Sequence, residues 1–402
     1  MVKQTLTKAT SSLKTLELNF LENTQKLEGV FAEKNRLIPG LIREYEKPIK
    51  DIEVEQTFSV LGEDFILSSN GWIYKKKGRN FSRFYYGIDY PIKKVIPYNF
   101  GEIPCIILLS GGYVNFIGGR NARFKCCYSC IEMLNGLLFA AKDSSVYFCS
   151  PLEFYGEEFK NSGKGAINLD PAFGKIVSLI NVKNALYVFQ EYAVSRLSAF
   201  YDSADFSLEK VVVLKDKISF SAKAVLDEVY FLVGNNIYCI NGLVCKKIRA
   251  LPLDFKPREC ALVNSIYAVL GESNYKSMVF FYDTVSGSLT TIYKVKSISD
   301  GGLSVGENGE LFAVKKGKGG FWQSKKISFN NPMPIVANKI ILNSLGEAKL
   351  KIYTDCLVKE YQIVKGKNQI ETELCVSEFY IEIQFIEGED LEISELKVLY
   401  RD

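Results

Sequence analysis

Short apolar runs and polar turns alternate along most of this chain. A run of about four residues rich in Val, Ile and Leu is followed by a polar turn and then by a second, aromatic-rich run, which is the pattern of a β-hairpin. Seven such hairpins occur between residues 64 and 322. They are Asp64–Leu67 with Trp72–Tyr74, Cys105–Leu108 with Tyr113–Phe116, Leu137–Ala140 with Val146–Phe148, Ala185–Val188 with Val194–Leu197, Val229–Leu232 with Ile237–Ile240, Ile266–Val269 with Met278–Phe281, and Leu311–Val314 with Gly320–Trp322.

The spacing of these hairpins predicts a propeller. From Phe65 to Leu311 they recur about every 41 residues, close to the roughly 40–45 residues of a four-stranded blade. Asn-Gly pairs, which favour the positive φ of tight turns, accompany four of them. These pairs are Asn70-Gly71, Asn135-Gly136, Asn241-Gly242 and Asn308-Gly309. We therefore predict an all-β fold with a β-propeller of six or seven blades over residues 55–330. Two irregular sandwiches with chance hairpins are the alternative, because individual spacings range from about 32 to 48 residues.

The first 54 residues follow neither pattern. The stretch from Leu13 to Leu41 has no sustained helical stripe and only weak strand alternation. We predict an N-terminal arm with short elements over residues 1–54. Its apolar residues need burial, either against a neighbouring subunit or against the propeller of the same chain. These residues are Leu16, Leu18, Phe20, Val30, Phe31, Leu37 and Ile38.

A linker rich in Pro and Asn, Asn330–Pro334, precedes a different pattern. The segment Phe379–Phe385 alternates apolar and polar residues with period two, as a half-buried strand does. The apolar positions then change phase between Ile393 and Leu396, which predicts a β-bulge. About six short strands in this region predict a C-terminal antiparallel β-sandwich over residues 331–402.

Composition agrees with a globular β-protein. Of 402 residues, 47% are hydrophobic, and the aromatic residues are mainly 27 Phe and 23 Tyr, types that suit strands. No apolar run approaches the roughly 18–20 residues of a membrane span, so we expect none. The N-terminal residues lack a signal-peptide pattern, and the ten irregularly spaced cysteines suit thiols in a reducing cytoplasm.

Charge is unevenly distributed although the net charge is only +4. Lys plus Arg against Asp plus Glu number 9 and 8 in residues 1–54, 33 and 25 in residues 55–330, and 8 and 13 in residues 331–402. The basic middle and acidic end could steer one protomer's end towards another's middle, or favour a polyanion. A solvated surface is the simpler interpretation.

The residues that carry most enzyme chemistry are missing or badly spaced. The sequence has no histidine, the commonest general base and metal ligand. Cys126, Cys127 and Cys130 form a Cys-x2-Cys cluster, but a closed zinc site without histidine needs four thiolates, and Cys239 with Cys245 is a poor second pair. We interpret these cysteines as buried thiols.

Glycine-rich segments and acidic pairs are equally weak signals. The segments Ser110–Gly112, Gly118–Arg120 and Gly317–Gly320 match neither the P-loop nor the dinucleotide fingerprint, and they predict turns. The acidic pairs Glu157-Glu158 and Glu371 with Glu373 are interpreted as solvated. We therefore predict that the chain is not an enzyme. No catalytic, cofactor-binding or metal-binding residue is assigned, and no cofactor is expected.

Three lysine clusters lie beside aromatic residues, a combination found in nucleic-acid grooves. The clusters are Lys75–Lys77, Lys315–Lys318 and Lys325–Lys326, and the aromatic residues are Trp72, Tyr74 and Trp322. Lysines also protect exposed strand edges from pairing, and we favour that interpretation.

Several segments between residues 128 and 245 go beyond composition. They are Glu132–Ala141, Ser145–Glu153, Glu158–Phe159, Gly174–Leu179, Asn184–Phe189, Ser219–Ala224 and Val229–Gly242. They resemble motifs of tailed-bacteriophage propeller proteins of the tail and head-tail connector, of the nozzle or tubular tail type. Phe379–Ile386 and Leu396–Tyr400 loosely resemble the closing β-domain of such proteins. The ten cysteines and the missing histidines depart from the family.

The resemblance implies a structural component of a bacteriophage or prophage-derived virion, forming a ring in the tail or head-tail connection around the DNA channel. Its implied partners are further copies of itself, other tail or connector proteins, and channel DNA by non-specific contact. Its implied location is the virion tail, after assembly in the host bacterial cytoplasm. The alternative is a carbohydrate- or receptor-binding propeller at the tail tip.

Overall fold

The chain folds almost entirely into β-strands. The computed structural model describes residues 13–18, 20, 24–28, 30–32, 36–46, 52–118, 121–154, 165–198, 206–219, 222–317, 320–329, 334–386 and 391–401. These contain forty strands and two 3-10 turns, Pro151–Glu153 and Pro171–Phe173. No helix in this described part is long and apolar enough to cross a membrane. The chain divides into a terminal unit (Met1–Arg43, Val285–Ile292 and Lys315–Asp402) and a propeller unit (Glu44–Thr284 and Tyr293–Val314).

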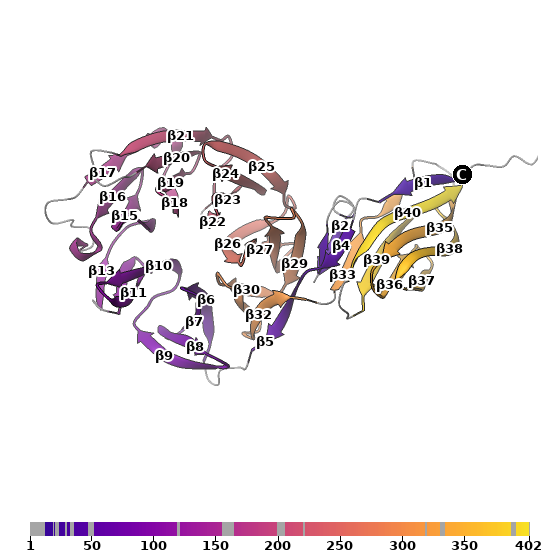
Figure 1. Cartoon of the computed structure of the whole chain (residues 1–402), viewed down its shortest axis with the longest axis horizontal. Helices are drawn as coiled ribbons and strands as arrows, with labels where there is room; N and C mark the ends of the chain where they lie inside the picture. Colours follow the sequence, from indigo (N-terminus) through magenta and orange to yellow (C-terminus); the bar gives the residue numbers. More distant parts are fainter. Residues whose placement is uncertain are drawn as a thin grey trace, which may run out of the picture. The chain divides into compact units, whose positions relative to one another are not determined.

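The propeller unit contains seven antiparallel blades arranged in a ring (Figure 1). Blade 1 has β6 (Val54–Val60), β7 (Glu63–Ser68), β8 (Trp72–Lys77) and β9 (Asn80–Tyr86); blade 2 has β10 (Ile92–Phe100), β11 (Ile103–Ser110), β12 (Tyr113–Ile117) and β13 (Ala122–Lys125). Blade 3 has β14 (Cys130–Leu134), β15 (Leu137–Lys142), β16 (Ser145–Cys149) and β17 (Gly165–Asn168); blade 4 has β18 (Ile176–Val182), β19 (Ala185–Gln190), β20 (Ala193–Ser198) and β21 (Ser207–Val213). Blade 5 has β22 (Lys223–Val225), β23 (Glu228–Val233), β24 (Asn236–Asn241) and β25 (Val244–Ala250); blade 6 has β26 (Lys256–Val263), β27 (Ile266–Ser273), β28 (Lys276–Asp283) and β29 (Leu289–Tyr293). Blade 7 has β30 (Val295–Ile298), β31 (Leu303–Gly306) and β32 (Leu311–Lys316), with β5 (Leu41–Tyr45) as its fourth strand. The predicted all-β propeller is confirmed, with seven blades.

The ring closes between the first and last blades. The first strand of each blade lies innermost, and β30 of blade 7 lies beside β6 of blade 1 (Figure 1). Strand β5 completes blade 7 from the N-terminal side of the chain. The Glu46 N–H donates to the Leu311 carbonyl at 2.8 Å, and the Tyr45 ring packs on Phe312 with centroids 6.2 Å apart. Both ends of the propeller sequence are therefore joined in one sheet, which leaves fewer unpaired edges.

Apolar side chains fill the spaces between neighbouring blades. One cluster joins Phe139 and Val146 of blade 3 to Leu179 and Leu186 of blade 4, and similar clusters lie between blades 1 and 2, 2 and 3, 4 and 5, and 7 and 1. A lone four-stranded sheet cannot cover both of its faces, whereas stacked blades bury them against each other. The period-two pattern of the hairpins therefore explains why the blades stack.

Six of the seven predicted hairpins are confirmed as the second and third strands of blades 1 to 6. The seventh is wrong. Strand β32 pairs with β31 across the Asn308-Gly309 turn, where Gly309 has φ 82°, whereas β33 (Gly320–Ser324) belongs to the terminal unit. Leu311–Val314 and Gly320–Trp322 have hairpin spacing, but spacing alone does not select a strand's partner.

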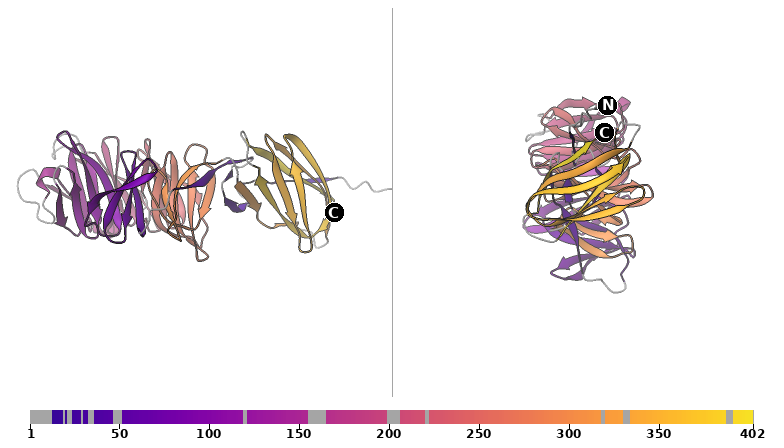
Figure 2. Two further views of the ribbon diagram at one scale, coloured as in Figure 1. Left: turned by 90° about the horizontal axis from the view of Figure 1, so that it is seen from below. Right: turned by 90° about the vertical axis from the view of Figure 1, so that its right-hand side faces the viewer.

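The terminal unit is a sandwich of two sheets with one shared core (Figures 1 and 2). Sheet 1 contains, in order, β3 (Val30–Ala32), β4 (Arg36–Pro39), β40 (Ile393–Arg401), β35 (Ile335–Ser344) and β38 (Gly366–Val376), and β1 (Lys14–Glu17) also pairs with β40. Sheet 2 contains β2 (Thr24–Glu28), β33, β39 (Glu378–Phe385), β36 (Ala348–Tyr353) and β37 (Val358–Ile363), with β34 (Ile327–Ser328) beside β39.

The predicted N-terminal arm instead supplies strands to this sandwich. Leu18, Phe20, Val30 and Leu37 lie in its core among residues from the other end of the chain. The Phe20 ring meets Trp322 edge to face at 5.1 Å, and the Trp322 Nε1–H donates to the Phe20 carbonyl at 3.3 Å. These four residues use neither burial site that we expected, a neighbouring subunit or the propeller, whereas β5 of the same predicted arm does join blade 7. The units therefore differ from the predicted boundaries at residues 54 and 330.

Two details of the C-terminal strands are confirmed. The alternating segment Phe379–Phe385 forms β39, whose four apolar side chains are all buried. The phase change in β40 is a bulge at Glu395, which has φ 56° and lies where the pairing with β35 shifts register. The bulge lets Ile393 and Leu396 both face the core. Of the predicted linker, Asn330–Met333 lies outside the described residues.

Candidate functional sites

Charged side chains pair between the innermost strands of the propeller. Lys94 of β10 contacts Glu132 of β14 at 2.6 Å, and Lys296 of β30 contacts Glu55 of β6 at 3.2 Å. Each pair joins neighbouring blades, so opposite charges supplement the apolar contacts where the blades converge. Because the side chains are partly exposed, each pair contributes little stability by itself.

A second polar group joins blades 5, 6 and 7. The Lys223 ammonium lies 2.8 Å from Asp300 Oδ2, and Asp300 Oδ1 accepts the Leu262 N–H at 2.7 Å. Burial disfavours the Lys223 charge, but the nearby carboxylates, Asp300 foremost, more than compensate and raise its pKa. Burial also raises the pKa of Glu259 to about 7, against the smaller opposing effect of Lys223. Glu259 is thus an acid that titrates near neutral pH.

Hydrogen bonds hold blade 1 to both of its neighbours. The Gln56 amide bonds both backbone groups of Ile92, donating to the carbonyl at 2.9 Å and accepting the N–H at 2.8 Å. On the other side, Thr57 Oγ1 donates to the Leu303 carbonyl at 2.9 Å, and the Ser59 and Ser299 hydroxyls share a hydrogen bond at 2.9 Å. Blades 1 and 7 are therefore held together by directional hydrogen bonds as well as by apolar packing.

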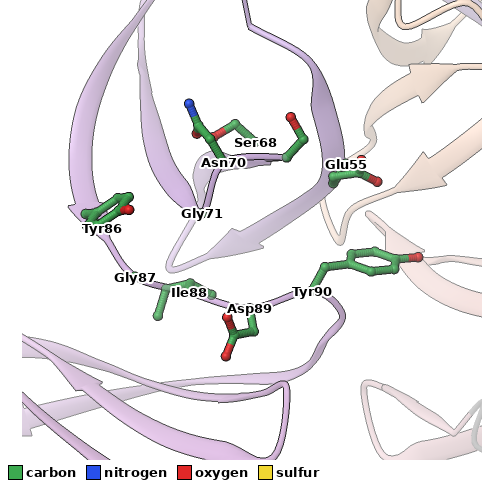
Figure 3. A pocket seen from close by; sticks show the side chains of 10 residues that line it. Glu55, Ser68, Asn70, Gly71, Tyr86, Gly87, Ile88, Asp89 and Tyr90 are labelled. Carbon is green, nitrogen blue, oxygen red and sulfur yellow. The ribbon is translucent and has the colours of Figure 1, made fainter.

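A pocket of about 300 Å³ lies between blades 1 and 2. The β7–β8 turn (Ser68–Gly71), the linker Tyr86–Tyr90 and Glu55 line it. Figure 3 shows Tyr86 and Tyr90 at the two ends of the linker, with Ser68 and Asn70 on the turn between them. The sequence marked the Asn-Gly turn, but nothing in the spacing of the linker residues indicated that they would meet it.

Backbone and side-chain hydrogen bonds fix the pocket's shape. The Gly71 carbonyl accepts the Gly87 N–H at 3.0 Å and the Ile88 N–H at 3.2 Å, which ties the turn to the linker. Arg123 of β13 donates to the Gly87 carbonyl at 2.6 Å and pairs with Asp89 at 2.5 Å. These bonds hold the linker from both sides.

The terminal unit has a pair of open strand edges. Within the described residues, β38 pairs only with β35, and β37 only with β36. Leu357, Val358 and Val364 around β37 are about half exposed. An unpaired strand edge presents free N–H and carbonyl groups to another chain.

The outer rim of blade 5 is a second candidate surface. Among the described strands, β25 pairs only with β24, and its Lys246 and Lys247 are exposed. Val244 and Ile248 of the same strand are also exposed. The rim thus combines an open backbone edge with positive charge and apolar surface.

The predicted cysteine cluster is divided by the fold. Cys126 lies in the apolar cluster between blades 2 and 3, Cys130 in that between blades 3 and 4, and Cys127 is exposed. Burial raises the pKa of Cys130 to about 12, so its thiol stays protonated at neutral pH and is a poor metal ligand. No group of three potential metal ligands occurs in the described part of the chain.

The remaining sequence candidates are also separated. Gly111 and Gly112 form the β11–β12 turn with φ 49° and 81°, as predicted. Glu371 pairs with Lys339 at 2.6 Å and Glu373 lies at a bulge with φ 44°, both on exposed surface of β38. Glu157 and Glu158 lie outside the described residues, as do parts of the other two glycine-rich segments.

Two of the three aromatic residues beside the lysine clusters are not stacking platforms. Tyr74 and Trp322 are buried, so their rings cannot stack with bases, whereas Trp72 is partly exposed and packs on Tyr86. Strand β8 has partners on both sides, which means that Lys75–Lys77 do not protect an edge. Instead Lys75 pairs with Glu63 at 2.6 Å and Lys76 with Glu46 at 2.5 Å.

No protein-family model and no curated protein matches this chain. Among solved structures it is similar to BBS1N, solved in complex with ARL6DN, with a TM-score of 0.47 and 10% identity over 69% of this chain and 96% of that one. PorZ of Porphyromonas gingivalis gives 0.45 and 11% over 80% of this chain and 46% of PorZ, so the chain spans about half of PorZ. BamB from Moraxella catarrhalis gives 0.42 and 10% over 76% and 97%. Likeness at this level concerns the fold alone.

Proposed function

We propose that this chain is a structural component of a bacteriophage or prophage-derived virion that forms a ring in the tail or head-tail connection, around the DNA channel. The resemblance of segments in blades 3 to 5 to tail propeller proteins supports the virion assignment. The observation that carries ring formation is the open edge of the terminal unit at β37 and β38. That the chain is not an enzyme stays a prediction.

The partner that fits this edge is the outer rim of blade 5 in a second copy. Residues 331–402 hold 13 acidic and 8 basic residues, and Glu371 and Glu373 are exposed along β38. Strand β25 offers Lys246 and Lys247 beside its own open edge. Strand pairing supplies directional hydrogen bonds. The opposite charges favour pairing of β38 with β25 over pairing of two β38 edges or two β25 edges.

Such a contact joins two different surfaces, so it is heterologous. Repeated heterologous contacts close into a ring when the rotation that relates one copy to the next is a whole fraction of 360°. The same chain can therefore build a ring without a dedicated dimer interface.

Native mass spectrometry and electron microscopy of the full chain test this assembly. We expect a ring-sized oligomer that falls to monomer in the double reversal Lys246→Glu/Lys247→Glu and in Glu371→Lys/Glu373→Lys. Mixing the two variants should restore association, because the reversed charges then match. The reversal Lys175→Glu/Lys183→Glu, at exposed lysines outside β25, is the control and should leave the oligomer intact.

A full chain that stays monomeric at every concentration, alone and with tail proteins encoded beside it, would contradict the proposal. So would an oligomer that survives both reversals.

A further inference from the structure

We propose that the pocket between blades 1 and 2 binds one ring of a neutral saccharide. This binding does not depend on ring assembly, because every group that lines the pocket belongs to the propeller unit of one chain. It would add a recognition function to a structural protein.

Two exposed aromatic rings flank the pocket. The Tyr86 and Tyr90 side chains are 60% and 59% exposed, unusually open for aromatic residues in this β-protein. One side of the Tyr86 ring is supported by Trp72, with centroids 4.9 Å apart, and the Arg83 guanidinium lies over Trp72 at 5.0 Å. A supported aromatic ring loses little conformational entropy when it packs against a ligand. The C–H face of a sugar suits such a surface, while the tyrosine hydroxyls remain available for hydrogen bonds.

The wall between the tyrosines is polar. Ser69 and Asn70 bring a hydroxyl and an amide, and Glu55 and Asp89 bring carboxylates. Sugar hydroxyls both donate and accept, so they can use all of these groups at once. An apolar ligand would leave the same groups without partners, at a cost for each one buried.

The charge balance selects a neutral ligand. Asp89 already pairs with Arg123 at 2.5 Å, and Glu55 with Lys296 at 3.2 Å. Each carboxylate thus has a cation of its own, and the pocket offers no uncompensated charge for an ionic ligand. The carboxylate lone pairs that these cations do not use still accept hydroxyl hydrogens.

The pocket is both preformed and small. The Gly71 carbonyl fixes the linker through two backbone hydrogen bonds, and Arg123 clamps it from β13 while stacking on Tyr113 at 3.9 Å. Preformed loops lower the entropy cost of binding. A volume of about 300 Å³ is at the lower end of ligand pockets, which suits a single sugar ring rather than a long chain.

Binding of the full chain to a glycan array of neutral and charged saccharides tests the proposal, followed by titration calorimetry with the best monosaccharide or short oligosaccharide. We expect at least one neutral saccharide to bind with a Kd of about 0.1–10 mM, as a ligand with few contacts should. Tyr86→Ala and Tyr90→Ala should each weaken binding about tenfold, equivalent to about 1.4 kcal/mol. Tyr275→Ala is the matched control, since Tyr275 is a fully exposed tyrosine on the β27–β28 turn of blade 6, and it should bind as the parent does.

Several results would overturn the assignment. They are no binding by any neutral saccharide at millimolar concentration, binding by charged saccharides only, or variants at Tyr86 and Tyr90 that bind within twofold of the parent. The Lys246→Glu/Lys247→Glu variant separates the two proposals, because a monomer that still binds the saccharide would leave this site standing if the ring fails.

Discussion

The propeller unit and the terminal unit bury similar apolar side chains, but the sequence separation between paired strands is much larger in the terminal unit. In the propeller, paired strands are mostly neighbours in sequence, as β19 and β20 are across a turn of two residues. In the sandwich, Lys14 of β1 pairs with Tyr400 of β40, and Leu27 of β2 with Trp322 of β33. The same residue chemistry thus builds one unit locally and the other from both ends of the chain.

This difference has a consequence for folding. Local hairpins close short loops, so blades 1 to 6 can form as the chain is made, whereas the sandwich core requires both ends of the sequence to be present. Blade 7 is intermediate, since β5 must join strands more than 250 residues away in sequence. We expect the terminal unit to be the last to form and the more sensitive to changes near the N-terminus.

The largest expected effect comes from removing one buried ring in each unit. Phe20→Ala should destabilise the terminal unit by about 3–5 kcal/mol, because it empties the space beside Trp322. Phe231→Ala, at a fully buried ring packed on Phe189 at 5.1 Å, should cost the propeller a similar amount. Hydrogen-exchange mass spectrometry reads the two units separately through β39 and β23.

Phe20→Ala should accelerate exchange in β39 and spare β23, and Phe231→Ala should do the reverse. Equal acceleration of both strands by either variant would show that the units unfold together, and the comparison between them would lose its basis.

A smaller effect is expected at the seam that closes the propeller. Thr57→Val removes the buried hydrogen bond to the Leu303 carbonyl and should cost about 1 kcal/mol, since that carbonyl loses one of two donors and keeps the Ser299 N–H at 2.9 Å. Thr284→Val removes an exposed hydrogen bond of similar length, 2.8 Å to the Ser265 carbonyl, and should cost less than about 0.5 kcal/mol. Chemical denaturation of both variants gives the two values. Equal losses in the free energy of unfolding would mean that burial does not strengthen the hydrogen bond at the seam.

A further effect depends on pH and concerns Glu259. Burial raises its pKa to about 7 from an ordinary 4.5, so the folded state holds the proton more tightly than the unfolded state does. The stability that this proton supplies is full below about pH 4.5 and is lost as the pH rises through 7. Glu259→Gln should therefore match the parent at low pH and exceed its stability by about 1–2 kcal/mol at pH 8, since solvent screens part of the effect.

Thermal melts of the parent and Glu259→Gln between pH 4 and pH 8 check this. A difference in melting temperature that does not change over that range would show that Glu259 does not titrate near neutrality in the folded protein.

The candidate sites were less predictable than the fold. The sequence indicated that charge is divided between a basic middle and an acidic end, and the structure places part of each on open strand edges at β25 and β38. The pocket could not be foreseen, because Asn70 and Tyr90 come together only through the Gly71 carbonyl and the clamp by Arg123. Neither bond leaves a periodic pattern in the sequence.

By itself, the sequence determined the strands and their local partners. Period-two alternation and Asn-Gly turns act between residues a few positions apart, so six hairpins and the burial of β39 follow from them. Only the tertiary structure decided that β33 leaves the propeller, that β5 closes it, and that Phe20 packs on Trp322. The pairing of strands about three hundred residues apart depends on competition among many strands with similar apolar faces. No short-range pattern in the sequence predicts which pair forms.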